Sequence, residues 1–184
     1  METMTTSIIL PFLVFFPFLG AVISYIIGRS NKGARDIWCW ILSAVIFIAS
    51  LTLIGKETVY SLRGFCGLGL SFAADGFGVI LAVLTGAIWL ITTIFSKEYM
   101  AAERNRNRYY FFVFLTLGAT MGIFLSADLF TTFIFFEIMS FTSFVLVMHD
   151  EEDFTVRSAK TYLAVAVIGG LVTLMGLFMM YQKA

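Results

Sequence analysis

The distribution of charge along the chain constrains its fold more than any other feature. Long uncharged runs alternate with short segments that hold nearly all of the Lys, Arg, Asp and Glu residues. A helix needs about 20 apolar residues to cross the hydrocarbon core of a bilayer, so these runs predict membrane spans. The composition agrees, since 60% of the residues are hydrophobic and 13% are charged, well outside the range of soluble domains. We therefore predict an all-α integral membrane protein without a large soluble domain.

The uncharged runs leave room for about six transmembrane helices in one membrane domain covering residues 1–184. The predicted spans are residues 7–28, 37–55, 76–96, 109–125, 127–148 and 159–182. The first run lacks a basic start and a convincing cleavage site, so we interpret it as a retained helix. Residues 58–74 are rich in Gly and too broken for a span, which predicts an outer loop that is partly extended.

The loops between these spans predict the orientation of the chain. Residues 29–36 carry three basic residues and residues 97–108 carry four, whereas residues 126–128 carry none. Basic residues are retained on the cytoplasmic side of a membrane. We therefore expect both termini to face outside, in a protein that crosses the cell (inner) membrane several times.

Redox chemistry within this chain is not expected. The topology places its two cysteines, Cys39 and Cys66, on opposite sides of the membrane, which argues against a disulfide. No spacing of Cys and His is typical of a metal, haem or iron–sulfur site, so we predict no cofactor and no metal. The formal net charge of zero does not indicate a nucleic acid partner.

Glu137 is the one charged residue that lies deep inside a predicted span. A charge at this depth costs at least about 2.5–3.5 kcal/mol on insertion scales, so such a residue usually faces protein or water. Burial without a cation favours the neutral carboxyl, and a nearby cation favours the carboxylate. A movable cation beside Glu137 would thus make it a proton relay. The alternative is a neutral glutamic acid that only contributes to packing.

Three further residues are candidates for a polar path. Ser140 lies one helical turn after Glu137 and supplies the nearest hydroxyl in sequence. Lys160 lies one to two turns inside the last span if that helix begins near Phe154, although a lysine there can also extend to the membrane surface. His149, the only histidine, ends the fifth span and is either a solvated interfacial residue or a proton entry point.

Three segments together resemble a known family of membrane subunits. Residues 72–100, "FAADGFGVILAVLTGAIWLITTIFSKEYM", are similar to its third helix, commonly D-G-L-S, an apolar helix and Y-S-x-x-Y-M. Residues 125–147, "LSADLFTTFIFFEIMSFTSFVLV", are similar to its fifth helix, in which Phe136 replaces a common Trp. Residues 157–170, "RSAKTYLAVAVIGG", resemble the start of its sixth helix. The family comprises the antiporter-like subunits of respiratory complex I, membrane-bound hydrogenases and multisubunit sodium/proton antiporters.

The resemblance implies that Glu137 is a central proton-translocation residue and that Lys160 is a less certain member of the polar chain. It also implies an incomplete antiporter-like fold, because the chain matches the first six helices of a longer pattern. The lysine that normally pairs with the glutamate belongs to a later helix. The expected partners are therefore other membrane subunits, including one that supplies the missing helices.

Three functions follow from these observations. The first is a split or shortened ion-translocating subunit, for protons or sodium, and the resemblance implies a non-redox subunit of an oxidoreductase or antiporter complex. The second is a structural or assembly subunit in which Glu137 stays protonated. The third is a small independent transporter. The presence of one buried carboxyl and no buried base argues against this third function.

Overall fold

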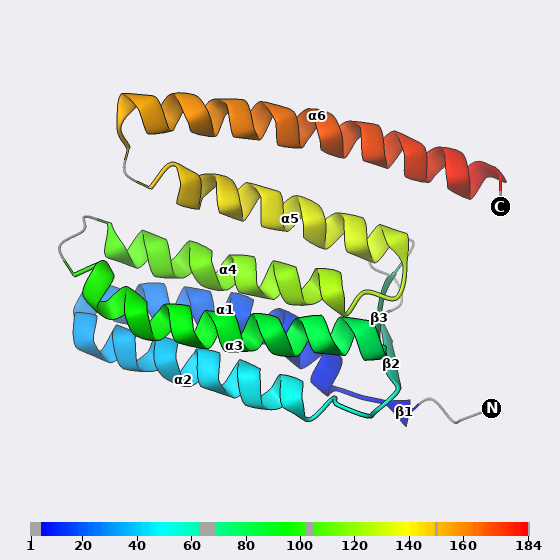
Figure 1. The fold of residues 1–184 in the computed structure, drawn as a ribbon, viewed down its shortest axis with the longest axis horizontal. Coiled ribbons are helices and arrows are strands. Elements are labelled where there is room, and N and C mark those ends of the chain that lie inside the picture. The colour runs from blue at the N-terminus through cyan, green and yellow to red at the C-terminus, as the bar shows by residue number, and fades with distance from the viewer. Residues whose placement is uncertain (1–4, 63–68, 102–104, 150, 184) are drawn as a thin grey trace.

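The computed structural model describes residues 5–62, 69–101, 105–149 and 151–183, and within these ranges the chain forms six α-helices and three short strands (Figure 1). The helices are α1 (Ile9–Ser30), α2 (Lys32–Leu51), α3 (Gly76–Tyr99), α4 (Arg106–Phe124), α5 (Leu129–Val147) and α6 (Asp153–Lys183). All of them except α4 are long and apolar enough to cross a membrane. The chain is therefore a multi-pass membrane protein, and the predicted all-α membrane fold is confirmed.

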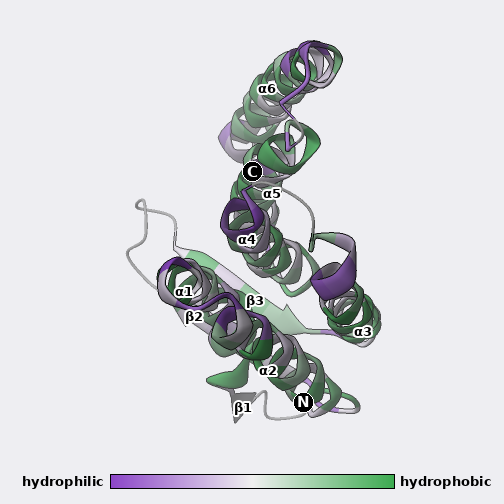
Figure 2. Ribbon diagram, turned by 90° about the vertical axis from the view of Figure 1, so that its left-hand side faces the viewer, coloured by the Kyte–Doolittle hydropathy of each residue, from purple (hydrophilic) through white to green (hydrophobic). Residues whose placement is uncertain are grey.

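α4 is the predicted span that is less apolar than the others, and its position explains the difference. Seen from the end of the bundle, α4 lies between α1 and α5 (Figure 2). Thr116 of α4 is buried, and its hydroxyl oxygen lies 2.8 Å from the carbonyl oxygen of Phe112 and 2.9 Å from the hydroxyl oxygen of Thr142 of α5. Because protein surrounds α4, this helix needs less hydrophobic surface toward lipid than its neighbours do.

Short polar residues set the start of three helices. The side chain of Asn31 accepts hydrogen bonds from the first turn of α2, Asp75 from that of α3 and Asp128 from that of α5. α2 therefore begins at Lys32 rather than at residue 37, and α6 begins at Asp153 rather than at residue 159. Both helices begin before their predicted spans because charge marks the edge of the hydrocarbon core, whereas helical hydrogen bonding continues beyond it. α2 also ends earlier than predicted, at Leu51 rather than at residue 55.

A small sheet covers one end of the bundle. β1 (Thr5–Thr6) runs parallel to β2 (Thr58–Leu62), and β2 runs antiparallel to β3 (Leu70–Ala74). The prediction of partly extended structure in residues 58–74 is confirmed for these strands, and residues 63–68, which include Cys66, lie outside the described residues. β1 and the end of α6 lie at this same end of the bundle (Figure 1). Which side of the membrane this end faces stays a prediction.

α1, α4, α5 and α6 form a row in this order, and α2 and α3 pack beside α1 and α4 (Figure 2). α1 and α4 supply more of the buried core than any other two helices. α2 packs on α1 and α3, while α4 packs on α1 and α5. The buried side chains between them include Leu13, Val14, Leu42, Phe114, Leu117 and Cys39. α6 packs mainly on α5 and forms the edge of the row (Figure 2). Only 11% of its most apolar window is buried, so nearly all of its surface is open to lipid or to another protein.

Candidate functional site

The carboxyl group of Glu137 lies midway along α5 and is directed at α6. A Cβ atom added at Gly170 of α6 would lie 2.8 Å from the carboxyl carbon of Glu137. The Oε1 atom of Glu137 is buried and has no hydrogen-bond partner among the described residues. A buried polar atom without a hydrogen-bond partner is destabilising and therefore uncommon in folded proteins.

Gly170 is what allows this approach. The sequence places Gly170 in a stripe of small residues with Gly169 and Gly176, which predicts close helix packing. In the structure, Gly170 is buried against Glu137, whereas nothing lies within 4 Å of a Cβ added at Gly169 or Gly176. Gly170 thus makes room for a carboxyl group, and the other two glycines face open space.

The space around Glu137 is a narrow crevice between α5 and α6. Ser140 and Phe141 line it on the α5 side, and Leu163, Ala166 and Val167 line it on the α6 side. The crevice is too tight to hold a water molecule. Within this crevice, therefore, no water molecule can bridge Glu137 to another group.

Ser140 lies beside Glu137, as predicted, but its hydroxyl group is already engaged. It donates a hydrogen bond of 3.0 Å to the carbonyl oxygen of Phe136 within α5. Among the described residues, no hydrogen bond joins Ser140 to Glu137.

Lys160 is not brought to Glu137. Lys160 is exposed and lies ten residues before Gly170, which is about 15 Å along the axis of α6. Among the described residues, no Lys, Arg or His nitrogen lies within 4.0 Å of the Glu137 carboxylate. The start of α6 at Asp153 does place Lys160 about two turns inside the helix.

His149 also lies far from Glu137, beyond the end of α5. Its ring stacks edge-on against Tyr109, with 5.7 Å between the ring centroids. Its backbone carbonyl accepts a hydrogen bond of 2.9 Å from Arg108, and its Nε2 atom is buried without a partner among the described residues. The structure therefore places His149 in the cluster of basic residues at the start of α4.

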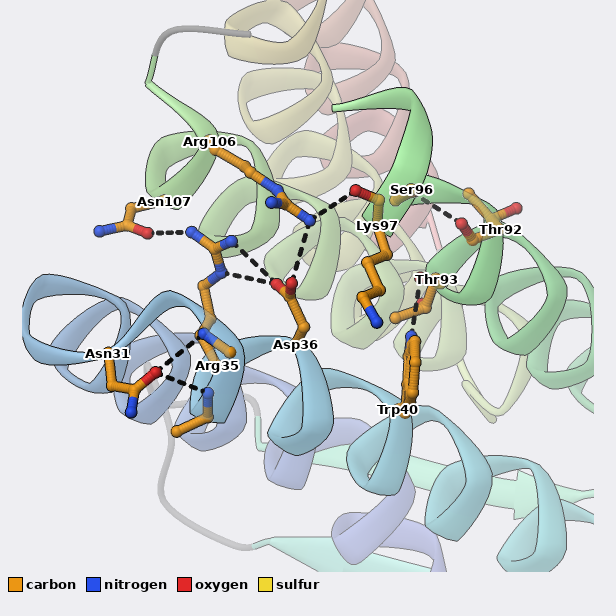
Figure 3. Close-up of polar contacts among 12 residues, drawn as sticks. Asn31, Arg35, Asp36, Trp40, Thr92, Thr93, Ser96, Lys97, Arg106 and Asn107 are labelled. Atoms are coloured by element: carbon orange, nitrogen blue, oxygen red, sulfur yellow. Dashed lines mark hydrogen bonds and ion pairs between the residues drawn. The ribbon is translucent and has the colours of Figure 1, made fainter. Parts of the chain in front are cut away.

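A polar network at this end of the bundle is the feature that the sequence interpretation missed (Figure 3). Asp36 of α2 accepts hydrogen bonds on one oxygen from Nε and Nη2 of Arg35, at 3.1 and 2.8 Å. Its other oxygen accepts from Nη2 of Arg106 at 3.1 Å. Arg35 is fully buried and Asp36 is 5% exposed. Residues assigned to a loop thus form a buried ion cluster between α2 and α4.

Aromatic and amide groups complete this network. The guanidinium carbon of Arg35 lies 4.8 Å from the ring centroid of Tyr110, and that of Arg106 lies 5.7 Å from it. Arg35 also donates a hydrogen bond to the side-chain oxygen of Asn107, and Arg106 donates one of 2.8 Å to the backbone carbonyl of Lys97. The network therefore joins α2, α3 and α4. The only sequence signal was an adjacent Arg-Asp pair directly before an apolar run.

No arrangement in the described part of the chain points to a metal. Groups of three or more His, Cys, Asp or Glu side chains that could hold an ion do not occur among these residues.

Comparisons with known proteins identify relatives of this chain. It is 28% identical over 187 aligned positions to the MnhD2 antiporter subunit of Staphylococcus aureus strain JH9, and strains Newman and USA300 give the same match. The alignment covers 97% of this chain and 36% of the relative, so the chain spans about a third of the length of these curated relatives. Models of protein families give no match.

Two solved structures share the fold. One is the membrane-bound sulfane sulfur reductase, an archaeal respiratory membrane complex, with a TM-score of 0.86 and 16% identity over 96% of this chain and 37% of the other. The second is the Mrp complex from Dietzia sp. DQ12-45-1b, with a TM-score of 0.68 and 23% identity over 90% of this chain and 18% of the other. The resemblance found in the sequence is confirmed.

Proposed function

Because the homologues of this chain are antiporter-like subunits, we propose that it is an ion-translocating part of such a subunit in a multisubunit complex of the cell (inner) membrane. The ion is a proton or, by exchange, sodium. Glu137 is the protonatable relay residue, and the complex is driven by redox chemistry in other subunits or by an ion gradient.

The observation that carries this proposal is the Glu137 carboxyl in the α5–α6 crevice. It lies in the middle of a helix long enough to span the membrane, and its Oε1 atom has no partner among the described residues. An acidic residue in such a place is a functional-site candidate by default. No described Lys, Arg or His nitrogen lies within 4.0 Å of this carboxyl, so it is open to pairing with a cation that another helix supplies.

The open surface of α6 supports a role for further membrane helices in the site. α6 has one principal neighbour, α5, and most of its other side chains are exposed. The open Gly169 and Gly176 let another helix approach closely. We expect this helix to supply the basic side chain that pairs with Glu137. Lys160 would then belong to the polar path near the membrane surface.

The second candidate is a structural subunit, in which Glu137 remains protonated and α6 only holds a neighbour. The buried network of Arg35, Asp36 and Arg106 favours this candidate, because it shows that ionisable side chains in this fold also serve packing.

Substitution of Glu137 separates the two functions. In the intact complex, Glu137→Gln keeps the shape of the side chain but removes the titratable proton, so ion transport by membrane vesicles should fall to background. Glu137→Asp should retain partial transport. Glu152→Gln is the matched control, because Glu152 is exposed and lies outside the helices. Normal transport by a fully assembled Glu137→Gln complex would leave the structural function as the better one.

A further inference from the structure

We propose that the basic end of the bundle holds a binding site for the phosphate headgroup of an anionic membrane lipid. An open cavity of about 870 Å³ lies there, between the end of α1, the start of α2 and the start of α4. Its lining includes four basic side chains, Lys32, Arg35, Arg106 and Arg108. This site is separate from the α5–α6 crevice and does not depend on the role of Glu137.

The charge balance of the cavity favours an anion. Among the described residues, no carboxylate lines it. Two carboxylates outside the lining take up part of the positive charge, because Asp36 pairs with Arg35 and Arg106, and Glu151 pairs with Arg108. Four cations and two carboxylates leave an excess of positive charge. Lys32 forms no ion pair among the described residues, so its full charge adds to this excess.

The cations are held in place before any ligand arrives. Arg35 is fully buried and is fixed by Asp36 and Asn107 (Figure 3). Its guanidinium group also lies over the ring of Tyr110. Because its side chain is only 1% exposed, Arg35 adds positive charge to the cavity wall rather than direct bonds to a ligand. Arg106 and Arg108 also line the cavity, are 15% and 28% exposed, and are held by ion pairs. Guanidinium groups held in this way suit direct binding of a phosphate, and preorganisation lowers the entropy lost on binding.

The location identifies the source of the phosphate as a lipid. α1 ends at Ser30, α2 begins at Lys32 and α4 begins at Arg106, so the cavity lies at the level where the helices leave the apolar layer. Tyr25 and Phe111 line the same cavity and stack with 5.8 Å between their ring centroids. Aromatic side chains beside cations fit the glycerol and acyl parts of a lipid next to its headgroup, and basic pockets between membrane helices bind such headgroups.

Lipid titration of the purified full chain tests this site. Phosphatidylglycerol is added in detergent, and bound lipid is counted by native mass spectrometry. Lys32→Gln should weaken binding about fivefold, the effect expected for one basic residue at an anionic headgroup. Lys97→Gln is the matched control, because Lys97 lies at the same end, over the Trp40 ring, and does not line the cavity. It should leave binding unchanged.

Two further arms identify the ligand. Phosphatidylcholine should bind at least several-fold more weakly, because its headgroup has no net charge. Inorganic phosphate should not displace phosphatidylglycerol at equal concentration if the aromatic wall contributes. Equal loss of lipid in the Lys32 and Lys97 variants would overturn the site, since it would show only a general charge effect. Full displacement by inorganic phosphate would overturn the assignment to a lipid.

Discussion

The buried carboxylate of Asp36 should be one of the strongest single contributors to the stability of this fold. It accepts three hydrogen bonds from two guanidinium groups, at 3.1 and 2.8 Å from Arg35 and 3.1 Å from Arg106. The side chains of Arg35 and Asp36 are 1% and 6% exposed, so solvent cannot replace the lost partner. Asp36→Asn keeps the size of the side chain but leaves Arg35 as a buried, uncompensated charge. We expect the free energy of unfolding to fall by about 3–5 kcal/mol.

A second ion pair at the same end of the bundle provides the control. Arg108 pairs with Glu151, but their side chains are 28% and 52% exposed. Glu151→Gln should therefore lower the free energy of unfolding by no more than about 1 kcal/mol. Both variants lose one negative charge near the same membrane surface, so the difference between them reports burial rather than net charge.

Denaturant unfolding of the purified chain in a mild detergent, followed by tryptophan fluorescence, measures both effects. Trp40 lies one helical turn after Asp36 and will report loss of the local packing. If Asp36→Asn and Glu151→Gln changed stability by the same amount, the buried network would be no stronger than a surface pair, and the reasoning would be wrong.

Substitutions at three glycines give further expected outcomes. Gly170→Ala should displace the Glu137 carboxyl and reduce ion transport by the complex, and normal transport by this variant would contradict the position of the carboxyl. In the isolated chain, Gly169→Ala meets nothing within 4 Å and should stabilise α6 by up to about 1 kcal/mol, as measured by thermal unfolding. Gly28→Ala would place a Cβ atom 2.8 Å from Cγ of Asn107, so thermal unfolding should show a loss of about 1–3 kcal/mol, and unchanged stability would refute this close approach.

The uncharged runs predicted the number and order of the helices, because hydrophobic length is a local property of the sequence. They did not predict where α2 and α6 begin. Asn31 is a single cap residue between two helices, and it lies inside a segment whose charges made it look like a loop. The membrane edge and the helix end are different boundaries, and only the first is marked by charge.

Only the part of the candidate site that is visible within one helix was predicted from the sequence. Glu137 stands out in sequence because it is alone in an apolar run, and the structure places it against α6. The partners of Asp36 could not be found this way, since Arg106 is 70 residues away and meets Asp36 only through helix packing. Lys160 was linked to Glu137 by family pattern alone, and its distance along α6 shows that the two are not direct partners.

The attachment of β3 to the connection between α4 and α5 has a mechanical consequence. The backbone N–H of Ala73 donates a hydrogen bond of 2.8 Å to the carbonyl of Leu125, and that of Ala127 donates one of 2.8 Å to the carbonyl of Ser71. These bonds attach the start of α5 to the sheet. α6 has no comparable tie among the described residues, and its main support is one face of α5. A tilt of α6 would therefore break few contacts besides those with α5. Such a tilt would open the crevice at Glu137 and leave the packing of the other helices unchanged.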